Sequence, residues 1–381
     1  IAVEEKPGAR VVFPADSAIG FCDSGLGLVQ LPMVQGRDSS YAVNVPFAQE
    51  MFSRIAPEQR RWVACLDKSG KGLFETSTDL LRGRKMFCWG MNAGGRRWQE
   101  YLSESGRAYI EIQAGLARTQ LECLPMPAQA LWTWTEAFGL LEADSAKAHS
   151  KDWAEARSAV DAAIEAILSR AEVDAAHAEF DKTAGLAPLE ILHRGSGWGA
   201  LEGVRARMQG ERDAMPAGTR YDDGDMSSEQ EPWRTFLETG AMPECDPLED
   251  PGPPMTQPEW RTMLEDALRA GRGEHWRSWY HLGVMRLEAL DEKGAREAWQ
   301  RSLALRGSGW AFRGLAVLAR RADDKAGERD YLCRAWETGP KIAPLAIEYA
   351  NALIAAKDYE ALGVLIDALP ETIKSHERVR I

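Results

Sequence analysis

The sequence predicts an α+β protein of several domains, in which an antiparallel β-sandwich portion precedes an α-helical region of repeated helix pairs. Residues 1–141 form short alternating runs separated by Gly and Pro, which is typical of β-strands. Apolar residues then recur at helical spacing, and aromatic and small residues repeat near the C-terminus. With 381 residues, the chain is long enough for two or three domains. We expect the sandwich portion over 1–141, a helical bridge with a Pro-, Gly- and Asp-rich linker over 142–258, and helical repeats over 259–381.

Composition and charge exclude several classes of function. Hydrophobic residues make up 45% and charged residues 27% of the chain, as in an ordinary soluble globular protein. The formal net charge of -12 argues against duplex nucleic acid or an anionic membrane as the main partner. No apolar run approaches the length of a membrane span. The six cysteines form no C-x-x-C pair and the six histidines form no cluster, so we expect no metal ion and no cofactor.

The N-terminus has no signal-peptide pattern, and we expect a cytoplasmic protein. The chain begins at Ile1, without an initiator Met, inside a segment that is typical of a strand. We therefore expect that residues upstream of Ile1, in a longer protein, complete the sandwich.

Several short runs are predicted as strands. The runs 62–66 and 72–76 flank the turn-forming Asp67-Lys68-Ser69-Gly70, so residues 62–76 are predicted as a hairpin. The other expected strands are 9–13, 85–89, 108–114, 119–124 and 131–136. Many short strands separated by turns favour a sandwich or an open barrel over a parallel α/β sheet.

Helices are expected from about Ala143 onward. Ser150 is predicted to cap a helix whose apolar positions run from Trp153 to Leu168, with a helical continuation to about Lys182. Further helices are expected at 200–208, at 229–238 and from Pro258 to about Leu268. Residues 210–258 are rich in Asp, Gly, Pro and Glu, and we interpret them as a linker or as a long ordered meander.

The C-terminal part of the chain contains a repeat. The spacing of a tetratricopeptide repeat, a helix pair of about 34 residues, is found for Trp279, Leu282, Gly283, Ala295, Trp299 and Leu305. A second copy contains Trp310, Gly314, Ala326 and Tyr331, and a degenerate third copy runs from Tyr349 to Pro370. The small residues are expected to let two helices approach closely while the aromatic residues fill the gap to the next pair. A protein partner is a possible ligand of such a stack.

The candidate site lies in residues 84–139, where aromatic residues stand beside carboxylates. In a strand at 108–114, Glu111 and Gln113 point to one face, and Ile110 and Ile112 point to the other. The same alternation in neighbouring strands would extend the face of Glu111. The residues expected on that face are Glu111, Gln113, Gln120, Glu122, Trp132, Trp134 and Glu136. Such a face is too polar for a core and too aromatic for plain exposure to solvent.

This combination of side chains suits a sugar or an oligosaccharide. The C–H faces of a sugar lie on Trp rings, and its hydroxyl groups bond Glu, Gln and Arg. The residues expected to bind it are Trp89, Trp132, Trp134, Arg84, Gln113 and Gln120. Glycoside hydrolysis needs an acid and a nucleophile or base, and Glu111, Glu122 and Glu136 are the catalytic candidates. The alternative is a half-exposed sheet whose Glu residues face water while Trp residues cover its edges.

Arginines stand beside these expected strands at Arg82, Arg84, Arg96 and Arg97. Their guanidinium groups suit acidic sugars or phosphate, or they pair with the nearby Glu residues. The glycines at 90, 94 and 95 lack the strand–loop–helix setting of a phosphate-binding loop, so we interpret them as a turn.

The chain resembles an uncharacterised bacterial family, a domain of unknown function, on the segments KMFCWG, GGRRWQEYL, YIEIQAGLARTQLECLPMPA, WTWTEAFG and LHRGSGWGALE. In that family a β-sandwich module precedes tetratricopeptide repeats, and the module is similar to the galactose-mutarotase-type supersandwich. Sugar epimerases, carbohydrate-binding modules and several glycoside hydrolases share this fold. The mutarotase mechanism pairs a histidine acid with a glutamate base, and residues 1–141 contain no His. The resemblance therefore implies a carboxylate-based glycosidase or a sugar binder rather than an epimerase.

Together, these features favour a carbohydrate-active protein, with glycoside hydrolysis as the expected reaction if it is an enzyme. The alternatives are a non-catalytic carbohydrate-binding module and a protein-interaction scaffold that acts through the helical repeats.

Overall fold

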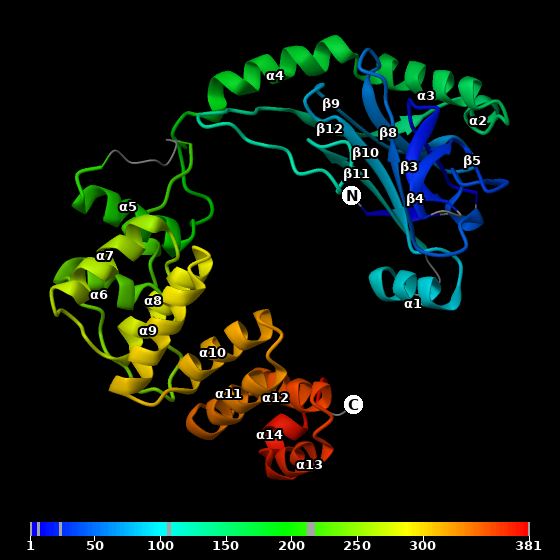
Figure 1. Cartoon of the computed structure of the whole chain (residues 1–381). Helices are drawn as coiled ribbons and strands as arrows, with labels where there is room; N and C mark the ends of the chain where they lie inside the picture. Colours follow the sequence, from blue (N-terminus) through cyan, green and yellow to red (C-terminus); the bar gives the residue numbers. More distant parts are fainter. Residues whose placement is uncertain (1, 6–7, 23–24, 105–107, 212–217, 380–381) are drawn as a thin grey trace. The chain divides into compact units, whose positions relative to one another are not determined.

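The computed structural model describes residues 2–5, 8–22, 25–104, 108–211 and 218–379, and the chain divides into two compact units (Figure 1). The first unit, Ile1–Leu186, contains the strands, and the second, Ala187–Ile381, is helical. Antiparallel sheets followed by a helical region are the predicted fold class. Residues 142–258, which were expected as one bridge, are divided between the two units.

The strands of the described residues form antiparallel sheets. They are β1 (Ala2–Glu5), β2 (Arg10–Val12), β3 (Ser17–Cys22), β4 (Gly25–Gln30), β5 (Met33–Val34), β6 (Arg37–Asp38), β7 (Gln49–Ser53), β8 (Arg61–Leu66), β9 (Lys71–Ser77), β10 (Gly83–Cys88), β11 (Ala108–Gly115) and β12 (Glu136–Glu142). Within the described ranges, the first sheet has the order β1-β11-β10-β7-β3-β4 and the second has the order β12-β9-β8-β2, while β5 pairs with β6. Every pairing is antiparallel.

The two larger sheets pack face to face around one core. Met86 and Ile112 of the first sheet share a hydrophobic cluster with Val11 and Val63 of the second. Every residue of β8 is buried, because β8 packs against the first sheet on one face and is covered by a helix on the other. Burial on both faces explains why β8 is a continuous apolar run, Trp62-Val63-Ala64-Cys65-Leu66, without the alternation of a half-exposed strand.

Helix α3 (Trp153–Ile167) covers the second sheet. Its buried residues, Trp153, Ala156, Val160 and Ile164, recur at helical spacing and belong to the core cluster of the sandwich. Trp62 of β8 donates from Nε1 to the Asp161 carboxylate at 2.6 Å. The predicted cap at Ser150 is wrong, because Asp152 accepts from Ala154 N and the helix begins one residue after Asp152.

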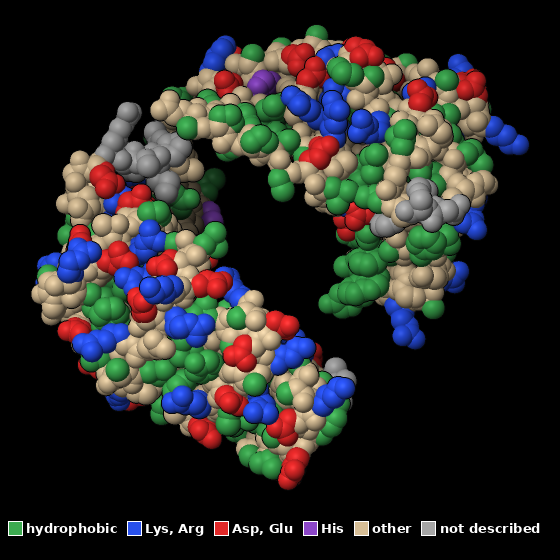
Figure 2. All heavy atoms as spheres, in the orientation of Figure 1, with side chains coloured by type: hydrophobic (Ala, Val, Ile, Leu, Met, Phe, Trp, Pro, Cys, Tyr) green, Lys and Arg blue, Asp and Glu red, His purple; other side chains and the backbone are tan. Residues whose placement is uncertain are grey.

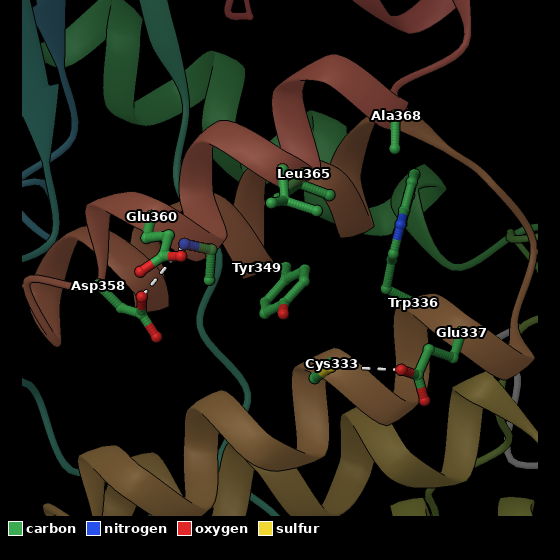
Figure 3. Close-up of a pocket in the computed structure, with 10 residues that line it drawn as sticks. Cys333, Trp336, Glu337, Tyr349, Asp358, Glu360, Leu365 and Ala368 are labelled. Carbon is green, nitrogen blue, oxygen red and sulfur yellow. Dashed lines mark hydrogen bonds between the residues drawn. The ribbon is translucent and has the colours of Figure 1, made fainter.

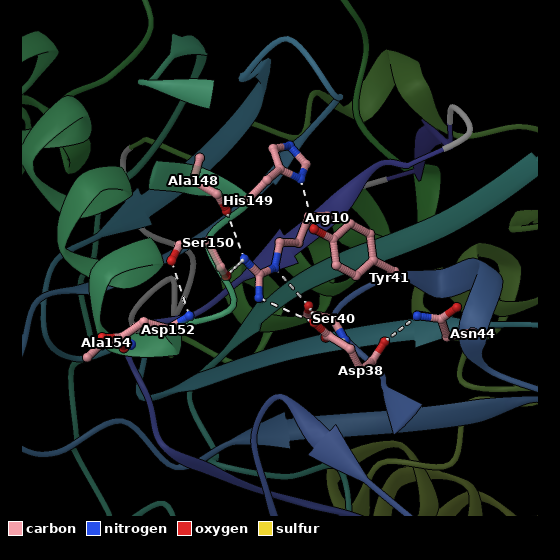
Figure 4. Close-up of polar contacts among 10 residues, drawn as sticks. All are labelled: Arg10, Asp38, Ser40, Tyr41, Asn44, Ala148, His149, Ser150, Asp152 and Ala154. Carbon is pink, nitrogen blue, oxygen red and sulfur yellow. Dashed lines mark hydrogen bonds and ion pairs between the residues drawn. The ribbon is translucent and has the colours of Figure 1, made fainter. Parts of the chain in front are cut away.

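Arg10 joins this helix to the sheet (Figure 4). The side chain is buried and donates to the Ser40 hydroxyl at 2.9 Å and to the carbonyl oxygens of Ala148 and Ser150 at 3.0 and 2.8 Å. Tyr41 and His149 are hydrogen bonded at 2.9 Å beside it. The guanidinium thus fixes β2 to the turn between helix α2 (Ser145–Ala148) and α3.

The hairpin predicted at 62–76 is confirmed, and two other predicted strands are wrong. Strands β8 and β9 pair across a turn in which Gly70 has a positive φ of 78° and the Asp67 carboxylate accepts from Ser69 N. Residues 119–124 and 131–135, in contrast, lie in an irregular segment that precedes β12. Pro125 and Pro127 supply no backbone N–H groups for a strand ladder in this segment.

Besides α2 and α3, the described residues form further α-helices. They are α1 (Ala93–Leu102), α4 (Arg170–Ala184), α5 (Gly197–Met208), α6 (Glu231–Thr239), α7 (Pro258–Arg269), α8 (Trp276–Glu288), α9 (Glu292–Leu305), α10 (Gly309–Arg321), α11 (Lys325–Thr338), α12 (Ala343–Ala355), α13 (Tyr359–Ala368) and α14 (Glu371–Lys374). Helices α8 and α9 form one closely packed pair, α10 and α11 form the next, and α12 packs against α11 and α13.

Trp299 of α9 shows how these pairs are held together. A Cβ added at Gly283 of α8 would lie 2.3 Å from the indole, and one added at Gly314 of α10 would lie 2.5 Å from it. The ring therefore lies between its own partner helix and the first helix of the next pair. It also donates from Nε1 to Tyr280 O at 3.1 Å. The predicted role of the small and aromatic residues in the repeat is confirmed at this position.

The segment between α6 and α7 is an ordered meander, which was one of the two interpretations of residues 210–258. Its carbonyl oxygens accept hydrogen bonds from side chains of three helices. The donors are Trp233 to Pro253, His275 at the N-cap of α8 to Met242, Trp276 to Cys245, Arg277 to Pro243 and Pro251, His281 to Pro251, and Trp310 to Glu249. These bonds satisfy backbone groups that a Pro-rich segment cannot pair in a helix or sheet.

We expect Gly314→Ala to destabilise the helical unit by about 1–3 kcal/mol, because the added methyl group meets a buried ring that is packed on both sides. Urea unfolding of the full chain, followed by circular dichroism, measures the loss. Gly363→Ala in α13 is the control, since a Cβ there meets no atom within 4 Å. The control is expected to be neutral or to gain up to about 1 kcal/mol. Equal effects of the two substitutions would contradict the packing role of Gly314.

Candidate functional site

Glu111 lies on the outer face of the first sheet in a short chain of hydrogen bonds. It accepts from the Tyr109 hydroxyl at 2.9 Å and from Gln113 Nε2 at 2.5 Å. Tyr109, Glu111 and Gln113 alternate along β11 with the buried Ile110 and Ile112, as the sequence predicted. Burial raises the pKa of the Tyr109 hydroxyl, and its hydrogen bond to the Glu111 carboxylate raises it further.

Lys85 of β10 lies in register with Gln113 on the same face. Its ammonium group donates to Gln120 Oε1 at 2.7 Å and lies 3.3 Å from the Glu50 carboxylate. It also lies 5.3 and 5.4 Å from the ring centroids of Phe52 and Phe87. Lys85 was not among the predicted site residues, because it directly follows Arg84 at the start of the predicted strand, and its burial depends on side chains from other strands that pack beside it.

The loop that follows β11 folds back beside this face. Gln120 donates to Gln113 Oε1 at 3.3 Å, and the Glu122 carboxylate accepts from Arg118 N at 3.1 Å. A pocket of about 330 Å³ lies between this loop, Lys85 and Gln113, and Glu122 is among its lining residues. A loop, and not the predicted strand at 119–124, thus brings Gln120 and Glu122 close to Gln113.

The charged guanidinium of Arg84 does not point into this pocket. The guanidinium is fully buried between the two sheets, and its Nε atom lies 2.5 Å from the Glu75 carboxylate of β9. It also donates to the Ser77 hydroxyl at 2.6 Å and to Leu81 O at 2.9 Å. Burial raises the pKa of Glu75 to about 7, against the lowering effect of Arg84. The sequence left two roles open for this arginine, binding of an acidic ligand or pairing with a nearby Glu. Its guanidinium is paired with Glu75.

Trp89 lies at the other end of the first sheet and is stacked on Trp98 of α1. The two ring centroids are 4.9 Å apart with an interplanar angle of 15°. Trp98 is 48% exposed, and its ring centroid lies 5.9 Å from that of Tyr101 at an interplanar angle of 85°. The inner ring, Trp89, is therefore shielded by Trp98, so Trp98 offers the accessible aromatic face here.

Trp132 and Trp134 line a different pocket, of about 260 Å³, against helix α4. They lie in the irregular segment before β12, so they do not alternate on a strand with Glu111 as predicted. His177 of α4 bonds the hydroxyl groups of Thr133 and Thr135 at 3.4 and 3.1 Å and holds the segment to the helix. Asp181 lines the same pocket. No sequence signal linked His177 to this segment, since the two lie more than 40 residues apart.

Glu136 begins β12 in the second sheet, opposite Ser77 of β9. Glu111, Glu122 and Glu136 thus come from the first sheet, from the loop after it and from the second sheet. The single strand face predicted for all seven residues is wrong, because two of its three strands do not exist.

A separate groove lies in the helical unit between α11, α12 and α13 (Figure 3). Its volume is about 430 Å³. Tyr349 of α12 lies between Cys333 of α11 and Leu365 of α13, and Trp336 borders the same space. The carboxylates of Glu337, Asp358 and Glu360 stand at its rim.

Burial and neighbouring acidic groups shift the pKa of Tyr349 in the groove. Burial raises the pKa of Tyr349 above its usual value, and its hydrogen bond to Cys333 and the charges of Glu337 and Asp358 raise it further. Lys341 lies 4.6 Å from the ring centroid of Trp336. Tyr349 was predicted only as a residue of the third repeat copy. The groove was not predicted, because it depends on how far apart α11 and α13 pack.

Within the described ranges, no group of His, Cys, Asp and Glu residues is arranged to hold a metal ion. The described helices also include none with the length and apolar character needed to cross a bilayer.

No family model matches this chain, and no curated protein matches it. Among solved structures, it is similar to a TPR-domain containing protein from Parabacteroides distasonis ATCC 8503, with a TM-score of 0.48 and 13% identity. The match covers 97% of this chain and 60% of that one, so this chain spans about 60% of the length of its structural relative. At this level of similarity, the match carries no information on ligands or partners.

We expect the single substitutions Arg84→Met and Glu75→Leu each to destabilise the sandwich by roughly 3–5 kcal/mol, because each leaves a buried charge unpaired. The double variant is expected to be more stable than either single variant, since it removes both charges. Chemical unfolding of the four full-length proteins measures these differences. If Arg84→Met retained full stability and lost affinity for a sugar, Arg84 would be a ligand-binding residue after all.

Proposed function

We propose that this protein is an interaction scaffold whose helical unit binds a segment of a partner protein in the groove between α11, α12 and α13. The observation that supports this function best is the groove itself, which combines an apolar floor with an acidic rim. Its volume of about 430 Å³ lies in the range of sites that hold several side chains of a ligand.

The apolar and acidic side chains of the groove indicate which kind of partner segment would bind there. Leu365 is buried in the floor, whereas Val364 beside it is 67% exposed and offers apolar area to a ligand. Glu337 and Glu360 are exposed at the rim, and a cation already lies against Trp336 in the form of Lys341. A segment with aliphatic or aromatic residues flanked by Lys or Arg complements both features.

We expect a fluorescent peptide of alternating Lys and Leu pairs to bind the full chain, and a peptide with Glu in place of Lys not to bind. Glu360→Lys is expected to lower the affinity at least 10-fold, since it places a cation at the rim. Glu297→Lys in α9 makes the same change of charge at an exposed position outside the groove and is expected to bind like the wild type. Fluorescence anisotropy at two salt concentrations measures all of these affinities. Equal binding of the Lys and Glu peptides would exclude the proposed partner chemistry.

A second candidate function is carbohydrate binding by the first unit. Two pockets support it, because each combines polar groups with aromatic rings or apolar walls. One contains Gln113, Gln120 and Glu122, and the other contains Trp132, Trp134, His177 and Asp181. The resemblance to a mutarotase-type supersandwich also favours a sugar ligand. In a glycoside hydrolase, Glu111, Glu122 and Glu136 would act as acid and as nucleophile or base.

Glycosidase activity is tested with the wild type and the variants Glu111→Gln, Glu122→Gln and Glu136→Gln on a panel of oligosaccharides. If the protein hydrolyses one of them, the loss of a catalytic carboxyl group is expected to lower the rate by about 10²–10⁴-fold. Glu142→Gln, at an exposed position of β12, is the matched control. Full activity in all three variants would remove these residues from the catalytic site, whereas binding without turnover would favour a binding module.

A further inference from the structure

Four arginines gather at one end of the sandwich, although the chain as a whole has a net charge of -12. Arg61 begins β8, Arg82 precedes β10, Arg118 lies in the loop after β11, and Arg170 begins α4. A Cβ at Gly83 would lie 2.1 Å from Ala117 O, so the backbones that carry Arg82 and Arg118 are in close contact. Figure 2 shows Lys and Arg side chains side by side over this part of the molecule.

The positive charge of this cluster is only partly neutralised. Arg170 forms an ion pair with Asp79, and Arg61 donates to Ala56 O and Pro57 O. Among the residues that the structure describes, no carboxylate pairs with the side chain of Arg82 or Arg118. Burial, opposed by the charge of Asp79, lowers the pKa of Arg61, and the cations Arg170, Arg118 and Arg82 lower it further. An anion at this position would relieve the repulsion among these cations.

Other carboxylates near the cluster already accept hydrogen bonds or form ion pairs, or they lie at the edge of the cluster. The Glu122 carboxylate accepts from Arg118 N, and Glu136 lies opposite Ser77, which is itself paired with Arg61 across β8 and β9. Glu165 forms an ion pair with Arg60 and also accepts from the backbone N of Arg170 at 3.1 Å.

The cluster is continuous with the pocket of Trp132 and Trp134. Thr78 N donates to Thr135 O at 3.1 Å, and Thr135 N donates back to the Thr78 hydroxyl at 3.2 Å. Arg170 and His177 lie seven residues apart on α4, which places them on one face about 10 Å apart along the helix axis. A ligand that touches both regions must therefore extend well beyond the size of a single inorganic ion.

We propose that this surface binds an acidic oligosaccharide, with a carboxylate or sulfate group on Arg82 and Arg118 and a sugar ring on Trp134. Planar guanidinium groups match the geometry of both oxyanions. Trp134 is 43% exposed and offers a ring face, while the carboxylate of Asp181 lines the same pocket and can accept from hydroxyl groups. This inference rests on the carbohydrate candidate above, and it is independent of the scaffold function.

Calorimetry on the full chain tests the proposal with trigalacturonate, a sulfated galactose trimer, the neutral galactose trimer and sodium sulfate. At least one acidic trimer is expected to bind 10-fold or more tightly than the neutral trimer and than sulfate, with an affinity that falls as salt rises. The two acidic trimers show whether the bound group is a carboxylate or a sulfate. Trp134→Ala is expected to weaken this binding.

Arg82→Ala/Arg118→Ala is expected to lower the affinity for the acidic trimer at least 10-fold. Arg96→Ala/Arg97→Ala removes the same charge from α1 and is expected to leave it unchanged, and circular dichroism verifies that both double variants are folded. Equal affinity for neutral and acidic trimers, or full binding by Arg82→Ala/Arg118→Ala, overturns the inference while carbohydrate binding stands. Binding of sulfate alone, or of no probe, overturns both.

Discussion

Buried indole rings whose N–H groups need an acceptor determine much of the packing in both units. In the first unit, Trp62 bonds Asp161 and Trp153 bonds Ala15 O, so each ring fixes α3 to the sandwich. In the second, Trp260 bonds Glu202 and thereby joins α7 to α5. An indole buried without such a partner would lose its hydrogen bonds to water with nothing in return. Each ring therefore contributes apolar area and also specifies which segment it packs against.

The same requirement explains the ordered meander of the helical unit. A segment such as DPLEDPGPP has few backbone donors and many carbonyl oxygens, so it cannot build regular structure of its own. Trp233, Trp276 and Trp310 supply the missing donors from α6, α8 and α10. The His281 imidazole also contacts Pro251 O, and its complete burial lowers its pKa to about 3. A neutral histidine in this position is consistent with a structural part in the repeat stack.

The candidate sites are formed by residues that do not take part in these indole contacts. The helical groove opens between α11 and α13, and Tyr349 of α12 forms its floor. In the sandwich, the buried pair of Arg84 and Glu75 holds the two sheets together, while Lys85 one position later faces the opposite side. Adjacent residues of one strand thus serve the core and the surface, because side chains alternate between the faces of a sheet.

The sequence by itself determined the order of the two regions, the hairpin at 62–76, the alternation of Tyr109, Glu111 and Gln113, and the repeat built around Trp299. Each of these follows from local periodicity or from turn-forming residues, which operate over a few positions of the chain. Only the tertiary structure decided that residues 119–124 and 131–135 are irregular, that Arg84 is buried against Glu75, and that Trp132 and Trp134 lie against α4. Those outcomes depend on contacts between residues far apart in sequence, such as Thr135 with His177, and local pattern carries no information about them. The stretch from Arg84 to Gly139 is accordingly divided among a buried ion pair, two pockets and the edge of the second sheet.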